Sequence, residues 1–80
     1  MGFLFSEAEL SITFARLAQA AKNEEKRKRK QANARLGYDR IQYFLSKPKP
    51  PMDQAEKEKL SPLISELKER LTELGERFEE

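Results

Sequence analysis

Apolar residues recur at alternating intervals of four and three along the C-terminal third of the chain. The series runs Leu60, Ile64, Leu67, Leu71, Leu74 and Phe78. This spacing places all of them on one side of an α-helix, whereas a strand would alternate apolar and polar residues. The pattern predicts a helix over residues 53–79. We expect its apolar seam to pack on other helices of the chain, with self-association through the same seam as the alternative.

Two start signals compete at the beginning of this helix. Asp53 and Glu56 have the spacing of a capping box. Ser61 followed by Pro62 has the order of an N-cap and a first helical position. Either the helix begins near residue 53 and bends at Pro62, or its main part begins at Pro62.

A second apolar series lies near the N-terminus, at Leu10, Phe14, Leu17 and Ala21. It also has helical spacing. Ser6 and Glu9 form a capping-box pattern just before it. We therefore expect a first helix over residues 6–22 that turns this series toward the core.

The middle of the chain allows one long helix or two shorter ones, because no glycine or proline lies between Gly2 and Gly37. The next apolar seam is Ala34, Tyr38, Ile41 and Leu45, which is out of register with the first. Asn23 followed by two glutamates is a favourable helix start, since Asn caps and acidic residues suit the positive end of the helix dipole. We predict a break at Asn23 and a second helix over residues 24–46.

These elements predict an all-α fold without strands, a small antiparallel three-helix bundle forming one domain over residues 1–80. Three prolines within residues 48–51 cannot continue a helix and predict an extended connector at 47–52. The expected core comprises Leu10, Phe14, Leu17, Ala34, Tyr38, Ile41, Leu45, Ile64, Leu67, Leu71 and Leu74.

The chain has no cysteine and no histidine. The usual general base at neutral pH, the Ser/His and Cys/His pairs and nearly all zinc ligand sets are therefore excluded. We expect no enzyme activity, no cofactor, no metal and no small-molecule ligand. No apolar run approaches the roughly 18 residues of a spanning helix, so we expect no membrane span and a cytoplasmic location.

Charge is distributed unevenly along the chain. Residues 23–47 hold eight basic and three acidic residues, whereas residues 48–80 hold six basic and nine acidic ones. A basic second helix facing an acidic third helix would pair charges across the bundle.

Five consecutive cations, Lys26, Arg27, Lys28, Arg29 and Lys30, form the most conspicuous motif. Together with Arg35 they are candidate contacts for phosphates of nucleic acid. No aromatic or glycine-rich element interleaves the run, so a solvated helix face is the competing interpretation. Tyr43 and Phe44 are aromatics beyond what the core needs, and we treat them as a candidate partner surface.

The stretch Ala34, Tyr38 and Ile41 before the proline-rich turn resembles the second helix of a tetratricopeptide-type hairpin. Three helices in about 75 residues with basic and acidic faces are also similar to MIT-type domains. Ile41 departs from the first pattern, where a small residue stands. The resemblance implies a protein-binding module and assigns no binding residues.

We therefore expect a non-enzymatic helical module that binds a protein partner or forms a homo-oligomer. The alternative is a small nucleic-acid-binding protein that uses the basic run 26–30.

Overall fold

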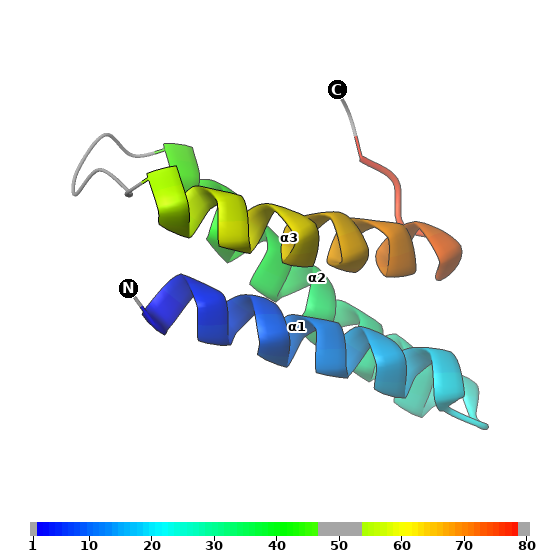
Figure 1. Cartoon of the computed structure of the whole chain (residues 1–80). Helices are drawn as coiled ribbons and strands as arrows, with labels where there is room; N and C mark the ends of the chain where they lie inside the picture. Colours follow the sequence, from blue (N-terminus) through cyan, green and yellow to red (C-terminus); the bar gives the residue numbers. More distant parts are fainter. Residues whose placement is uncertain (1, 47–53, 79–80) are drawn as a thin grey trace.

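The computed structural model describes residues 2–46 and 54–78 and contains three helices. They are α1 (Gly2–Ala20), α2 (Glu24–Ser46) and α3 (Gln54–Glu73) (Figure 1). α2 runs antiparallel to α1 and α3, and no strand occurs in the described ranges. The expected small antiparallel three-helix bundle is confirmed. The predicted connector 47–52 and the predicted cap Asp53 lie outside the described residues.

Asn23 separates the first two helices. Its side-chain Oδ1 accepts a hydrogen bond from the backbone N–H of Lys26 at 2.8 Å, which is the N-cap interaction. Glu24 and Glu25 occupy the first turn of α2, where the helix dipole favours them. The predicted break at Asn23 and the predicted bounds of the second helix are confirmed.

The predicted start of the first helix at Ser6 is wrong. α1 begins at Gly2, so Ser6 lies inside the helix and does not cap it. The physical reason is that Leu4 packs against the core, which favours continuing the helix toward the N-terminus. α1 ends at Ala20, and the N–H of Ala21 bonds the carbonyl of Ala18 at 3.3 Å in a tightened last turn.

The predicted end of the third helix at residue 79 is also wrong, because α3 stops at Glu73. Gly75 has a φ of 104°, a conformation that side chains disfavour. The N–H of Glu76 bonds the Leu71 carbonyl at 2.9 Å, and that of Gly75 bonds the Thr72 carbonyl at 3.0 Å. This pair of bonds is the Schellman ending of a helix. Residues 76–78 therefore leave the helix axis.

Pro62 lies inside α3, which begins at Gln54, so the alternative in which the main helix begins at Pro62 is wrong. Proline has no N–H to donate to the carbonyl of Glu58, and the helix continues with that one bond missing. About two turns of helix precede Pro62 at residues 54–61, and Leu60 within them is buried. That burial helps to hold the segment in place.

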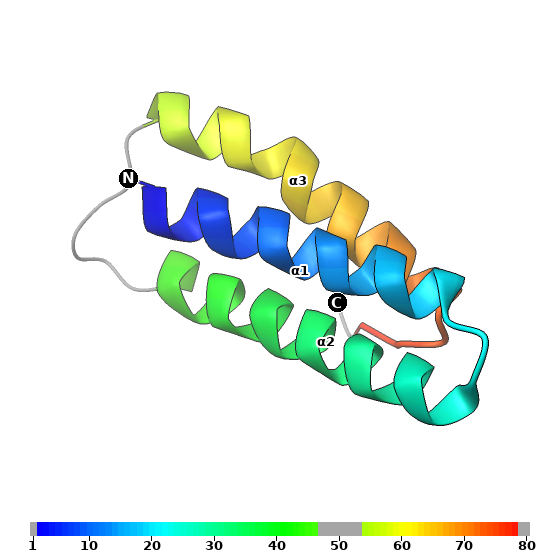
Figure 2. The same cartoon turned by 90° about the horizontal axis from the view of Figure 1, so that it is seen from below.

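α1 is the central helix, since it contacts both neighbours while α2 and α3 touch each other least (Figure 2). Its inward face carries small side chains. Ala8, Ala15 and Ala18 are fully buried, and Ser11 is almost so. Ser11 stands against Gly37 of α2, where a Cβ atom would lie 2.9 Å from the Cβ of Ser11. The two backbones can approach this closely because neither position carries a bulky side chain.

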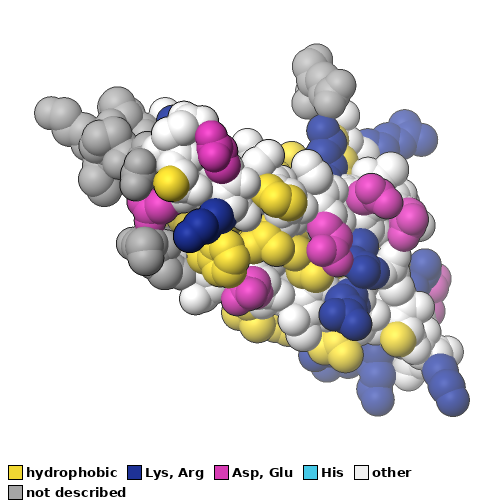
Figure 3. All heavy atoms as spheres, in the orientation of Figure 1, with side chains coloured by type: hydrophobic (Ala, Val, Ile, Leu, Met, Phe, Trp, Pro, Cys, Tyr) yellow, Lys and Arg dark blue, Asp and Glu magenta, His cyan; other side chains and the backbone are white. Residues whose placement is uncertain are grey.

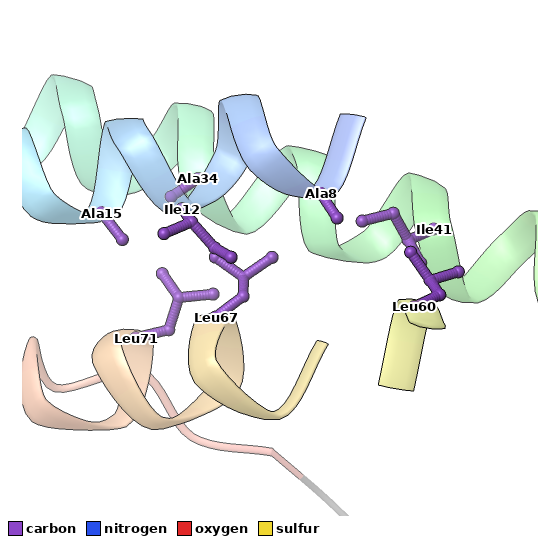
Figure 4. Packing of buried hydrophobic residues seen from close by; sticks show 8 residues of the cluster. All are labelled: Ala8, Ile12, Ala15, Ala34, Ile41, Leu60, Leu67 and Leu71. Atoms are coloured by element: carbon purple, nitrogen blue, oxygen red, sulfur yellow. The ribbon is translucent and has the colours of Figure 1, made fainter. Parts of the chain in front are cut away.

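The core forms where larger side chains of α3 reach this small-residue face. Figure 4 shows Leu67 and Leu71 pointing up toward Ile12 and Ala15, with Ile41 and Leu60 meeting at the other end. Ala34, Ile41, Leu67 and Leu71 are buried as predicted. Other predicted core residues are half-buried against this cluster, namely Phe14, Tyr38, Leu45, Ile64 and Leu74. The seam of α3 packs on the other helices, as expected.

Two residues of the predicted core are not in it. Leu10 is 52% exposed and Leu17 is 46% exposed. α1 offers two faces of helical spacing, one with leucines and one with Ala8, Ser11, Ile12 and the alanines that follow. The second face points inward because small side chains allow the closest packing with α2 around Gly37.

Replacing Leu67 with Ala should lower the free energy of unfolding by about 2–5 kcal/mol, because the fully buried side chain would leave a cavity. Leu17→Ala makes the same chemical change at an exposed position and should cost less than about 1 kcal/mol. Urea denaturation followed by far-UV circular dichroism measures both. A larger loss at Leu17 than at Leu67 would mean that the leucine face of α1 is the buried one.

Gly37→Ala should destabilise the protein by about 1–3 kcal/mol through overpacking against Ser11. Helix propensity alone predicts the opposite sign, a gain of about 1 kcal/mol. In a Ser11→Gly background the cost of Gly37→Ala should be clearly smaller, because the colliding atoms are gone. Thermal unfolding of the two single variants and the double variant measures the coupling. A stabilised Gly37→Ala variant would refute the close approach.

Candidate functional site

The basic run lies on the first two turns of α2, and its five side chains have different surroundings. Arg27 pairs with Glu24, and Nη2 of Arg29 lies 3.8 Å from Oε1 of Glu25, both on the same helix. Nζ of Lys30 lies 5.5 Å from the ring centroid of Phe14 on α1. Stacking on an aromatic face stabilises such a cation.

Lys26 and Lys28 are the least committed cations of the run. Both are exposed, and within the described residues neither has a carboxylate within ion-pair distance. Arg29 is also exposed, and its pair with Glu25 is long. The run therefore presents at least three cations to solvent at one end of the bundle.

Arg35 does not lie with the basic run, because it binds the segment that follows α3. Its Nη1 donates to the backbone carbonyl of Arg77 at 3.1 Å and lies 3.4 Å from Oε1 of Glu76. Its guanidinium carbon lies 4.4 Å from the ring centroid of Phe78. Phe78 in turn meets the ring of Tyr38 edge to face, with centroids 4.8 Å apart. Arg35 thus holds residues 76–78 against α2.

The expected charge pairing between α2 and α3 takes a different form. Among the described residues, Arg35 of α2 forms an ion pair with Glu76, which lies beyond the end of α3. Glu66 pairs with Arg70 at 2.9 Å on α3 itself. Glu73 accepts a hydrogen bond from Gln19 of α1 at 2.7 Å. The physical reason is that α2 and α3 contact each other less than either contacts α1.

Tyr43 and Phe44 lie near the C-terminal end of α2 and are 56% and 43% exposed. Their rings meet edge to face with centroids 5.6 Å apart. Leu36 is 50% exposed and lies two helical turns before Tyr43, on the same side of α2. A rise of 1.5 Å per residue puts Tyr43 about 22 Å from Lys28. The structure therefore does not bring the two sequence-predicted sites together.

A third surface was missed by the sequence analysis, which assigned its leucines to the core. The outer face of α1, defined as Ser6, Leu10, Thr13, Leu17 and Ala20, repeats at intervals of four and three, and all five residues are exposed. A surface helix ordinarily turns charged residues outward. Here the face carries two large aliphatic side chains among small ones. The competing small-residue face, from Ala8 to Ala18, was the signal that could have revealed it.

Charges at the rim of this outer face are few. Glu9 and Arg16 lie beside it, one helical repeat apart, and both are exposed. Among the described residues neither has an ion-pair partner. Within α1 the other charged residue is Glu7, which lies 3.3 Å from Arg40 of α2.

Figure 3 shows the neighbouring side of the molecule, with α1 and α3 toward the viewer. Hydrophobic side chains gather between these two helices. Most of the lysines and arginines visible in this view lie toward the right-hand end, near the junction of α1 and α2. The described residues contain no cluster of acidic side chains arranged to hold a metal ion. Every buried side-chain nitrogen or oxygen in the described part of the chain has a hydrogen-bond partner.

Comparison with protein-family models, with curated proteins and with solved structures finds no match for this chain. In the ranges that the structure describes, none of the helices combines the length and the apolar character needed to cross a bilayer.

Proposed function

We propose that this protein is a non-enzymatic helical module that binds another protein through the outer face of α1. The observation that carries the proposal is the exposure of Leu10 and Leu17 on a face of regular heptad spacing. An 80-residue chain has little apolar surface to spare, so two leucines left outside its core are better explained by a partner.

Further features support a binding role. α2 adds Leu36, Tyr43 and Phe44 to the exposed large hydrophobic residues of the molecule. Aromatic side chains are enriched in protein interfaces. The absence of histidine and cysteine from the sequence argues against an enzyme. We also propose that the protein acts in the cytoplasm.

Photo-crosslinking in the native host tests the proposal. A photoreactive amino acid at position 10 or 17 should give a covalent protein adduct, whereas the same residue at exposed Ser65 on α3 should give none. Leu10→Lys should weaken the adduct formed from position 17, because a charge would then enter the apolar contact. Equal adducts at all three positions, or none at 10 and 17, would refute the proposed surface.

The exposed cations of the basic run support a second candidate function, binding to phosphates of RNA or DNA. Fluorescence anisotropy with random RNA and duplex DNA at low and near-physiological salt measures it. This candidate predicts micromolar binding that falls steeply with salt, and a loss of about tenfold or more in Lys26→Glu/Lys28→Glu. Glu substitutions at Lys57 and Lys59 on α3 are the matched control. No binding at low salt, or equal losses in both variants, would dismiss it.

A further inference from the structure

The outer face of α1 has an internal symmetry that points to its partner. Glu9 and Leu10 recur one heptad later as Arg16 and Leu17, with the same apolar residue and the opposite charge. A helix rotates about 100° per residue, so the two pairs lie almost directly above one another. Each leucine therefore has a charged neighbour on the same flank, acidic at one end and basic at the other.

A two-fold axis between the two pairs makes this face complementary to itself. If two α1 helices lie antiparallel about residues 13 and 14, Leu10 of one copy comes opposite Leu17 of the other. The same operation brings Glu9 beside Arg16 of the second copy, and this occurs twice because the interface is symmetric. A parallel two-fold arrangement would instead place Glu9 and Arg16 of the two copies on opposite flanks of the interface, where they could not pair.

The structure leaves these groups available for such a contact. Leu10 and Leu17 are exposed, and Glu9 and Arg16 are exposed without ion-pair partners among the described residues. Ser6, Thr13 and Ala20, between and beside the leucines, are small enough to let two helices approach closely. The seam of α3, the other candidate for self-association, is occupied, since Leu60, Leu67 and Leu71 are buried in the core.

We propose that two copies of this chain associate antiparallel through the outer face of α1. The inference rests on the proposed protein-binding function of that face and names its partner as a second copy. α1 has 19 residues and is about 28 Å long at 1.5 Å per residue. A single pair of such helices buries less than the roughly 800 Å² per partner of a standard interface, so we expect a dissociation constant on the order of micromolar.

Sedimentation equilibrium of the full chain, from low micromolar to near-millimolar concentration, tests this dimer. The wild-type protein should sediment as a monomer–dimer equilibrium. Leu10→Lys should weaken dimerisation by about tenfold or more, since each dimer would bury two unpaired ammonium groups. Ser65→Lys, which adds the same charge at an exposed position of α3, should leave the dissociation constant within about twofold. Circular dichroism checks that each variant remains helical.

A charge swap tests the antiparallel arrangement. Glu9→Arg alone and Arg16→Glu alone should each weaken the dimer by about five- to tenfold at low salt, because two attractive pairs become repulsive. The double variant Glu9→Arg/Arg16→Glu should recover wild-type affinity, since each pair again joins opposite charges. Recovery in the double variant supports the two-fold arrangement, whereas additive losses would overturn it.

A wild-type chain that stays monomeric at every concentration would overturn self-association. The proposed binding function would survive that result if photo-crosslinking from position 10 or 17 captured a different protein. Adducts with twice the mass of the chain would instead support the dimer.

Discussion

The close approach of α1 and α2 at Ser11 and Gly37 is the constraint on which the remaining structure depends. It fixes which way α1 faces, because a small-residue face must meet the glycine. Once Ala8, Ala15 and Ala18 point inward, helical geometry turns Leu10 and Leu17 outward. The packing that stabilises the pair of helices therefore also creates the surface to which we assign binding.

α3 completes the core from the open side of α1. Its leucines fill the space above the alanines, and this division of large and small side chains between facing helices is how a short chain reaches close packing. α2 and α3 make few direct contacts with each other. The segment after Gly75 adds further contacts between the C-terminal part of the chain and α2. Arg35 and Tyr38 of α2 hold Glu76 and Phe78 there.

The resulting surface separates two chemistries. One end of α2 presents cations to solvent, and the outer face of α1 presents leucines with few charges. The local sequence predicts that the cations are exposed, but it does not predict that Leu10 and Leu17 are. Their exposure depends on which of the two apolar faces of α1 packs against α2. The charge of Arg35 groups it with the cations in the sequence. Its contacts with residues 76–78 follow from the tertiary structure, in which that segment folds back against α2.

The sequence by itself determined the helical class, the break at Asn23, the bounds of α2 and the buried seam of α3. These follow from local capping, helix dipole and periodicity, which need no tertiary partner. Tertiary structure alone decided the rotation of α1 and the path after Gly75. Both depend on contacts between residues far apart in the sequence. The close approach of the α2 backbone at Gly37 to Ser11 selects the inward face of α1, and the contact of Phe78 with Tyr38 places the segment after Gly75.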